Sequence, residues 1–359
     1  MSGHSSAERS GAVPSAMANA PEGANPAQGQ HEYGVGSDTT LRARWQRFEE
    51  RGLVMTLAAM VLCIGIPNHA FFNLASIVSI LRQASLVTII SFGMVFMISM
   101  IELDLSVGGI YAMATTISAI LIKSSGLDPW MAVLIALGVS TLLGAANGII
   151  ANLIQVPVII VSLGSLPLFV GITLTISNAQ PIIGMPEGHT FFRLFGSDWF
   201  GLPAAFWTMV AVGIVLHVVF IHSRFGTAVR AVGSNTQAAF FTGIRVSRVR
   251  VSVTALVGLL SGLSGVLTLA FFKSTDPTVG HGLELQVIAA AVIGGTSLAG
   301  GSGTMLGAVL GVLIISTINS GIVFFGIDSN YAELITGLVI LVAISLDRVL
   351  KRKRGASAP

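Results

Sequence analysis

Apolar runs of roughly 20 residues, the length that crosses a bilayer, recur along most of this chain. Of its 359 residues, 53% are hydrophobic and 10% are charged, whereas ordinary soluble domains carry about 25% charged residues. Because lipid offers the backbone no hydrogen-bond partner and the runs show no strand-like alternation, each run is expected to be helical. The sequence therefore predicts an all-α polytopic membrane protein.

We expect about ten transmembrane helices, some of them broken or short. Their approximate limits are 53–72, 84–101, 105–123, 130–152, 157–178, 204–222, 251–272, 284–300, 303–325 and 332–348. With the N-terminus placed inside, the outer connections hold only four of the 19 basic residues, namely Arg82, Lys123, Arg193 and Lys273. The positive-inside rule then predicts that both termini are cytoplasmic.

The ends of the chain differ from the apolar middle. Residues 1–40 are rich in Ser, Gly, Ala and Pro and lack the apolar core of a signal peptide, which predicts a disordered N-terminal tail. The transmembrane domain then covers 41–350, and 351–359 form a basic cytoplasmic tail. Cys63 is the only cysteine, which excludes an intrachain disulfide and a cysteine-based metal cluster.

Residues 223–250, the central basic segment, separate two apolar halves and contain no acidic residue. Their arginines are Arg224, Arg230, Arg245, Arg248 and Arg250. Ser234 or Asn235 can cap a short helix over 236–241 by accepting a backbone N–H, and Gly243 suits the end of that helix. The segment either receives force from a cytoplasmic partner or serves only as a basic loop that sets the topology.

The sequence IELDLSVGG brings acidic groups into the apolar pattern. Glu102 and Asp104 come just before a helix expected to begin near Ser106, Gly108 and Gly109. Acidic groups at membrane depth cost several kcal/mol unless they are paired or hydrated, so they tend to mark function. In the alternative interpretation, Asp104 or Ser106 caps this helix at the cytoplasmic surface, where the charge costs little.

A second break is GGTSLAGGSG, residues 294–303, in the short eighth run. Short, glycine-interrupted segments are typical of discontinuous helices around a transport path. Gly294 and Gly295 allow close backbone approach, and Thr296 and Ser297 supply hydroxyls. Tight packing between helices through small residues is the alternative. No Lys-Ser or Lys-Thr follows, so the stretch is not a P-loop.

Three connections on the outer side have two interpretations each. Within 73–83, polar residues recur at every third position, which suits either a helix lying in the membrane interface or an extension of the second span. The outer connections 180–203 and 273–283 are either docking surfaces for something arriving from outside or solvated connectors.

No catalytic constellation is present in the sequence. The seven histidines show no metal-ligand spacing, and nucleophile elbow, zinc and dinucleotide motifs are absent. The net charge of +3 does not indicate a nucleic-acid partner, because the basic residues sit in loops and tails. We therefore expect no catalytic and no metal-binding residue. The spans also lack a row of charges for an ion relay, which argues against a carrier that powers itself.

The motifs ELDLSVGG, VRAVGSNTQAAFFTGI and IGGTSLAGGSGTMLGAVLG resemble the ribose/xylose/arabinose-type sugar permeases of bacterial ABC importers, over residues 70–348. The resemblance implies an inner-membrane permease present in two copies, two cytoplasmic ATPase domains that bind ATP and Mg²⁺, and a periplasmic sugar-binding protein. It implies no cofactor on this chain. The long N-terminal tail lies outside the pattern.

The resemblance also assigns roles to residues. In the central basic segment the ATPase-coupling residues are Arg230, Gly233, Asn235, Ala238, Ala239 and Gly243; Gln237 stands where relatives often have Glu. The resemblance also implies that segment 73–83, LDLSVGG and GGTSLAGG lie along or support the translocation path. The path residues singled out are Asp104, Ser106, Gly108, Gly109, Gly294, Gly295, Thr296 and Ser297. Two alternatives stay open: the same machine with another cargo, such as a branched-chain amino acid or a nucleoside, and a carrier or channel working alone.

Overall fold

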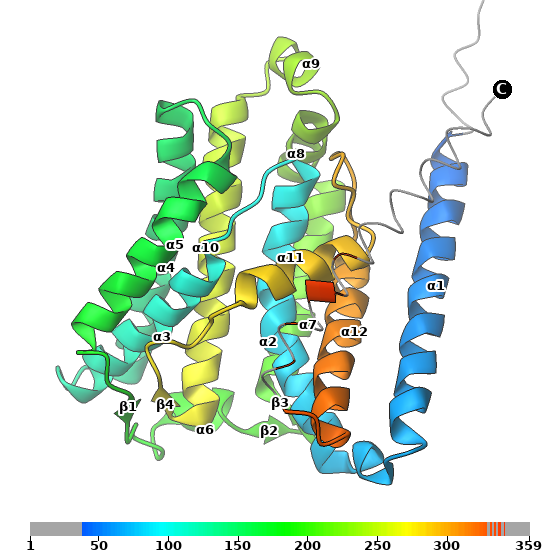
Figure 1. Ribbon diagram of the computed structural model, residues 1–359. Coiled ribbons are helices and arrows are strands. Elements are labelled where there is room, and N and C mark those ends of the chain that lie inside the picture. Colours follow the sequence, from blue (N-terminus) through cyan, green and yellow to red (C-terminus); the bar gives the residue numbers. More distant parts are fainter. Residues whose placement is uncertain (1–37, 329–330, 332–333, 335–336, 339–340, 342–359) are drawn as a thin grey trace, which may run out of the picture. The chain divides into compact units, whose positions relative to one another are not determined.

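The computed structural model describes residues 38–328 together with residues 331, 334, 337, 338 and 341 (Figure 1). The expected basic tail, nearly all of the expected disordered tail and most of the expected last span lie outside the described residues. The chain divides into two units, residues 1–45 and 46–359, and the packing described below lies within the second.

Helices make up most of the described chain. In chain order they are α1 (Asp38–Gly65), the 3-10 helix η1 (His69–Phe72), α2 (Leu74–Ser99), α3 (Val107–Lys123), α4 (Pro129–Leu153), α5 (Val158–Ile176), α6 (Thr190–Phe195), α7 (Ala204–His222), α8 (Arg224–Ser234), α9 (Thr236–Phe241), α10 (Val246–Phe272), α11 (Leu283–Ile293) and α12 (Met305–Phe324). Six of the described helices are long and apolar enough to cross a membrane: α2, α4, α5, α7, α10 and α12. The prediction of a polytopic helical membrane protein with some short helices is confirmed.

Four short strands lie at one end of the bundle, called here the strand end. β1 (Ile182–Ile183) pairs antiparallel with β4 (Ser274–Thr275), and β2 (Asp198–Trp199) pairs antiparallel with β3 (Leu202–Pro203). The first pair joins the two outer connections, because β1 belongs to one and β4 to the other. Helices α8 and α9 project from the opposite end, called here the α9 end (Figure 1).

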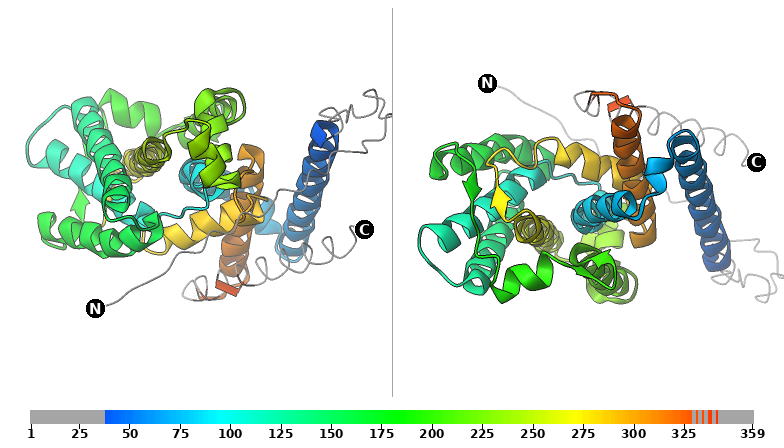
Figure 2. Two further views of the ribbon diagram at one scale, coloured as in Figure 1. Left: turned by 90° about the horizontal axis from the view of Figure 1, so that it is seen from above. Right: turned by 90° about the horizontal axis from the view of Figure 1, so that it is seen from below.

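Helices α2 and α10 lie side by side in the middle of the bundle. Figure 2 shows α3, α4 and α5 on one side of this pair and α12 on the other. Every residue of α2 from Val87 to Ser99 is buried, and Phe92, Phe96 and Met97 are among its largest enclosed side chains. A helix that is apolar all round is expected at the centre of such a bundle.

The seam between α4 and α10 is built from small residues. A Cβ added to Gly144 on α4 would lie 2.9 Å from the Cα of Gly258 on α10, and one added to Gly262 would lie 2.6 Å from the side chain of Ser140. Small residues let helix backbones approach closely in a membrane, where dispersion contacts replace the hydrophobic drive. The seam fixes α10 against α4 along much of its length.

Several expected boundaries differ in the structure; α10, for example, begins at Val246 rather than at 251. The α-helix of the first expected span ends at Gly65, residues 66–68 form a turn, and η1 follows. Residues 74–83 continue α2 without a break, so the interfacial helix is the wrong one of the two interpretations. The eighth run was expected to be helical to 300, but α11 ends at Ile293, and Gly295 shortly after it takes a positive φ of 86° that does not continue a helix.

Candidate functional site

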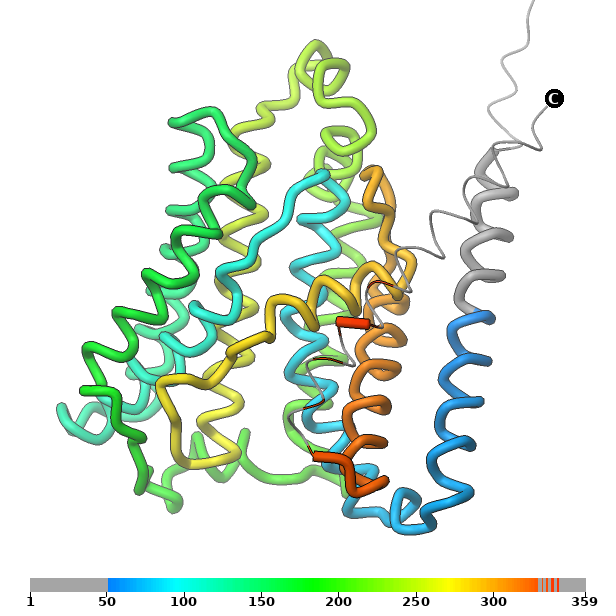
Figure 3. Tube along the Cα trace, in the orientation of Figure 1, coloured from blue at the N-terminus to red at the C-terminus, as the bar shows by residue number. Residues whose placement is uncertain are grey.

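After α2 the chain turns back into the bundle without forming a helix. Residues 100–106, the re-entrant stretch, run from the α9 end of α2 to the beginning of α3 (Figure 3). Non-helical backbone at membrane depth is tolerated only when protein surrounds it and satisfies its polar groups. Here the N–H of Leu105 donates to Ser162 Oγ at 3.0 Å, and the N–H of Glu102 donates to the carbonyl of Met97 at 3.0 Å.

A buried polar network holds the end of this stretch. Asp104 is fully buried, and its Oδ1 accepts hydrogen bonds from the N–H of Ser106 at 2.8 Å and from Ser106 Oγ at 2.7 Å. Asn147 on α4 donates to Ser106 Oγ at 2.8 Å. Ser106 is the N-cap residue of α3, but its side chain makes no capping bond. The expected cap is therefore replaced by a turn that Asp104 closes, and this turn is buried rather than at the surface.

Helices α3 and α11 begin close to each other in the interior. A Cβ added to Gly108, in the first turn of α3, would lie 2.5 Å from the carbonyl oxygen of Gly280 and 2.7 Å from Oε2 of Glu284. Glu284 occupies the first turn of α11. The positive ends of both short helices thus meet around one carboxylate, as the helix dipoles favour. Only glycine at position 108 permits this approach.

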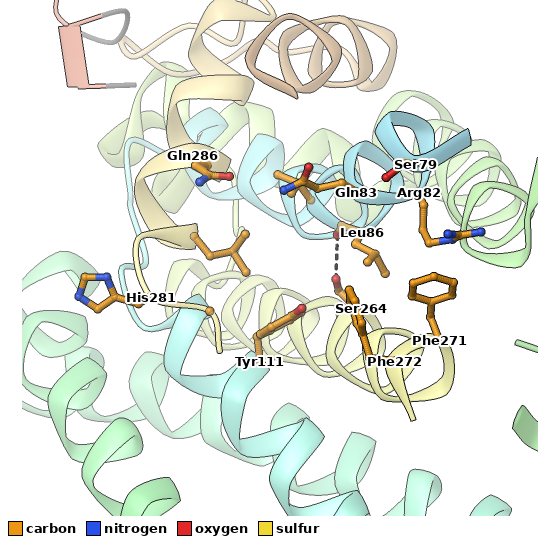
Figure 4. A pocket seen from close by; sticks show the side chains of 13 residues that line it. Ser79, Arg82, Gln83, Leu86, Tyr111, Ser264, Phe271, Phe272, His281 and Gln286 are labelled. Carbon is orange, nitrogen blue, oxygen red and sulfur yellow. Dashed lines mark hydrogen bonds between the residues drawn. The ribbon is translucent and has the colours of Figure 1, made fainter. Parts of the chain in front are cut away.

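A cavity of about 460 Å³ opens beside this meeting point (Figure 4). It lies in the half of the helices nearer the strand end and is called here the outer cavity. Its walls come from α2, α3, α10 and the beginning of α11, and the lining residues are Ser79, Arg82, Gln83, Leu86, Val87, Tyr111, Ser264, Phe271, Phe272, Gly280, His281, Leu283 and Gln286. Amide, hydroxyl and aromatic groups therefore face one small space.

The charged group at the outer cavity is held by two partners. Arg82 forms an ion pair of 2.5 Å with Asp198 of β2, and its guanidinium carbon lies 3.7 Å from the ring centroid of Phe271 (Figure 4). Stacking on a ring and pairing with a carboxylate both restrain an arginine. The remaining polar side chains of the wall include Gln83 and Gln286, whose amides can both donate and accept hydrogen bonds.

Hydroxyl groups tie the inner wall of the outer cavity to its neighbours. Tyr111 shares a hydrogen bond of 2.8 Å with Thr268, and Ser264 Oγ donates to the carbonyl oxygen of Leu86 at 2.8 Å (Figure 4). These bonds join α3 to α10 and α10 to α2. The shape of the cavity is thus set by three helices that are locked together by side chains.

The glycine-rich residues 294–303 lie at the α9 end, away from the outer cavity. The N–H of Gly301 donates to the carbonyl oxygen of Ser99 at 2.9 Å. A Cβ added to Gly233 of α8 would lie 2.9 Å from the nitrogen of Gly301, and one added to Gly300 would lie 2.6 Å from the carbonyl oxygen of Gly233. Gly233, Gly300, Gly301 and Ser99 form what we call the glycine junction, where α8 touches both broken stretches.

The projection formed by α8 and α9 is capped as the sequence predicts. Asn235 Oδ1 accepts the N–H of Ala238 at 2.9 Å, and Gly243, with a φ of 87°, follows the end of α9. Ala239 is buried against the bundle. Arg230 turns back, and its Nη2 donates to the carbonyl oxygen of Ile221 at 3.2 Å, which fixes α8 to the end of α7.

Residues 76–344 match the protein-family model described as branched-chain amino acid transport system / permease component. The chain belongs to this permease family. It is 37% identical over 301 residues to a ribose import permease of Bacillus subtilis (strain 168), covering 84% of this chain and 93% of that protein. It is 33% identical over 310 residues to a D-allose transport system permease of Escherichia coli (strain K12), covering 86% and 93%.

A ribose import permease of Escherichia coli (strain K12) is 33% identical over 301 residues, which cover 83% of this chain and 93% of that protein. No solved structure matches the chain significantly. The resemblance inferred from the three sequence motifs is confirmed.

The structure places the predicted path residues of this permease at two separate sites. Asp104, Ser106, Gly108 and Gly109 lie at the start of α3, and Gly108 abuts Gly280 in the wall of the outer cavity. The residues from Gly294 to Ser297 follow α11 near the glycine junction. None of the eight predicted residues lines the outer cavity itself.

Of the residues that line the outer cavity, Ser79, Arg82 and Gln83 belong to segment 73–83, which the resemblance places along or beside the path, and the others were not predicted from the sequence. Gln286 is a polar side chain inside an apolar run, and this signal could have marked it. Tyr111 and Phe271 carry no such signal, because an aromatic residue in a membrane helix usually packs in the core. The cavity is assembled from four distant parts of the chain.

Proposed function

We propose that this permease is the transmembrane subunit of an ATP-driven ABC importer that moves a monosaccharide, or a related polyol, from periplasm to cytoplasm by alternating access. It is a multi-pass protein of the bacterial inner (plasma) membrane. The relatives named for ribose and allose import support the cargo class. The chain itself carries no catalytic role in this proposal, and ATP with Mg²⁺ is bound by the partner subunit.

The exposed tip of α9 is the observation that carries the ATP-driven part of the proposal. Phe240 and Phe241 are 66% and 84% exposed, and they lie next to each other with ring centroids 5.9 Å apart. Beyond the membrane-crossing helices no lipid covers such side chains, and adjacent exposed aromatic residues are typical of a contact site for another protein. We infer that a cytoplasmic ATPase subunit receives them, with the central basic segment around them.

The composition of the outer cavity favours a neutral hydroxylated cargo. Its volume falls within the range of about 300–1,000 Å³ that is usual for small-molecule sites. Among the described lining residues there is no carboxylate, while Glu284 lies against Gly108 beside the cavity, so the ammonium group of an amino acid would find no countercharge in the wall itself. Gln83, Gln286 and Tyr111 can bond hydroxyls, and the rings of Phe271 and Phe272 offer apolar faces. A monosaccharide therefore fits better than a branched-chain amino acid.

The joined outer connections are suited to receive a periplasmic sugar-binding protein. The pairing of β1 with β4 is reinforced by an ion pair of 2.7 Å between Lys273 and Glu187. The chain that follows β4 connects this surface to the outer cavity, because it contains Gly280 and His281 of the cavity wall. We propose that docking here opens a route for the sugar, and that a second copy of the permease completes the importer as a homodimer with about ten spans per copy.

The proposal is tested by reconstituting the permease in proteoliposomes with its ATPase and sugar-binding protein. We expect uptake of labelled ribose or allose, but not of leucine, and only with ATP and all components present. The double variant Phe240→Ser/Phe241→Ser should lose uptake and binding of the ATPase. The matched control for ATPase binding is Phe200→Ser, because Phe200 is 97% exposed at the strand end, away from α9.

Two results would contradict the proposal. Uptake by the permease alone, without ATPase, would show that it works as a carrier or channel. Leucine uptake in preference to sugars would show that the cargo class is wrong. A binding panel on the solute-binding protein separates sugars from nucleosides.

A further inference from the structure

A buried ion pair joins the re-entrant stretch to the beginning of α10. Arg250 Nη2 lies 2.6 Å from Glu102 Oε1, and the side chains of Glu102 and Arg250 are 8% and 22% exposed, so the carboxylate is buried and the guanidinium partly buried. Two charges withdrawn from water cost several kcal/mol each unless their geometry compensates, so such a pair is weak evidence for stability and calls for another explanation.

Both partners are anchored to further elements. Arg250 Nη1 donates to Asn152 Oδ1 at the end of α4 at 2.9 Å, and Asn152 Nδ2 donates to the carbonyl oxygen of Ser247 at 2.9 Å. Glu102 Oε2 accepts the N–H of Val158, the first residue of α5, at 2.8 Å. The N-cap residue of α5, Pro157, makes no side-chain cap, so Glu102 supplies this function from another part of the chain.

The position of Arg250 connects the pair to the α8–α9 projection. α9 ends at Phe241 and α10 begins at Val246, so Arg250 lies in the second turn after a short linker. Any displacement of α9 reaches this turn through four residues of chain. The other end of the projection, Gly233 in α8, packs against Ser99 in the glycine junction.

The chain between these two contact points is short and conformationally unusual. Ser99 touches α8, and Glu102 binds α10. Between them Ile101 has a φ of 63°, which is a costly conformation for a β-branched residue. A change in the spacing between the end of α8 and the start of α10 must therefore be absorbed by residues 99–102, and from there it reaches Asp104 and the first turn of α3.

We propose that Glu102 and Arg250 are positioning residues that transmit the movement of α8 and α9 to the re-entrant stretch, and so couple ATP hydrolysis to sugar movement. This inference rests on the proposed ATP-driven import. The pair acts through the backbone of residues 100–106 and does not touch the sugar, since neither residue lines the outer cavity.

The test measures sugar molecules transported per ATP hydrolysed in the complete reconstituted importer. Because neutralising one partner leaves the other charge buried and lowers stability, the double variant Glu102→Gln/Arg250→Gln carries the test. We expect the number of sugar molecules transported per ATP to fall about tenfold, a change of the size that the loss of an interaction between two contacting groups can produce. Its ATPase rate and unfolding temperature should stay near those of the unaltered protein. Arg250→Lys, which keeps the charge, should retain most of the coupling.

The control is Thr175→Val, which removes an exposed hydroxyl bond to the carbonyl oxygen of Gly171 within α5, and it should leave the ratio unchanged. A folded Glu102→Gln/Arg250→Gln variant with the unaltered ratio would overturn the inference. That outcome differs from a failure of the proposed function, in which the unaltered protein itself shows no ATP-dependent uptake.

Discussion

The carbonyl oxygen of Ser99, at the end of α2, accepts a hydrogen bond of 2.9 Å from the N–H of Gly301. Gly301 belongs to the glycine-rich stretch after α11, so the two breaks in the membrane helices meet at one bond. Gly233 of α8 packs on the same carbonyl. A movement of α8 therefore acts on both broken stretches at once, although they lie far apart in the sequence.

We expect Gly233→Ala to disrupt this junction. The new Cβ would overlap the carbonyl of Ser99 and would lie 2.9 Å from the nitrogen of Gly301, both of which are backbone atoms that cannot rotate away. Overpacking of this kind costs about 1–3 kcal/mol, so the unfolding free energy in detergent should fall by that amount and uptake should fall with it.

The control for this prediction is Gly171→Ala in α5, where an added Cβ meets no atom within 4 Å. Alanine is the better helix former, so this variant should be neutral or slightly more stable. Equal denaturation midpoints for the two variants would show that the junction has room for a side chain.

Gln286 lines the outer cavity, and we predict that its amide binds the sugar. Gln286→Leu removes an amide from the cavity wall without opening space, so the loss is that of hydrogen bonding to the cargo. One such bond is worth about 0.5–1.5 kcal/mol, and we expect the sugar concentration for half-maximal uptake to rise up to about tenfold in assays with limiting binding protein. Leu285→Ala is the control, because Leu285 is exposed and does not line the cavity. An unchanged concentration dependence in Gln286→Leu would argue against contact with the sugar.

The turn leading to the cavity contains an aspartate with a lowered pKa. Thr278 Oγ1 donates to Asp276 Oδ1 at 2.5 Å, and the N–H of Thr278 donates to the same oxygen at 2.8 Å; both bonds favour the carboxylate and lower the pKa of Asp276. The stabilisation of this turn is therefore present above the pKa of an unfolded aspartate and is lost as the pH falls through the lower pKa of the folded state. Its magnitude is small because the side chain is exposed.

We expect Thr278→Val to raise the pKa of Asp276 toward the ordinary value, because the hydroxyl bond is its main cause. Thr278→Ser keeps a hydroxyl and should keep the lowered pKa. The measurement is a carbon NMR titration of the labelled carboxyl groups in nanodiscs. Identical titration curves for Thr278→Val and the unaltered protein would contradict the assignment.

The apolar pattern predicted regular helices well and failed where the backbone leaves the helix. The expected run 204–222 coincides with α7, and 130–152 differs from α4 by one residue at each end. These helices are bounded by Pro203 and Asp128, whose effects are local. The end of α11 depends on Gly295 and on the contacts of the following loop, which a hydropathy window averages away.

The alternation at the start of α2 shows why the residue pattern alone does not define the outer cavity. Ser79 and Arg82 recur at helical spacing among apolar residues, which the sequence allowed to be interpreted as the polar face of an interfacial helix. In the structure both residues line the outer cavity. One polar stripe on a helix can face headgroups or a cavity, and only the positions of α10 and α11 decide between them.

The membrane orientation is tested by labelling single cysteines in intact cells. The natural Cys63 is exposed and must first be changed to serine. Gln237→Cys places a thiol on α9, and Gly188→Cys places one in an outer connection where an added side chain meets no atom within 4 Å. We expect a membrane-impermeant maleimide to label Gly188→Cys directly and Gln237→Cys only after the cells are permeabilised, because the arginines around α9 favour the cytoplasmic side. Direct labelling of Gln237→Cys would place α9 outside the cell, where no ATPase could bind Phe240 and Phe241.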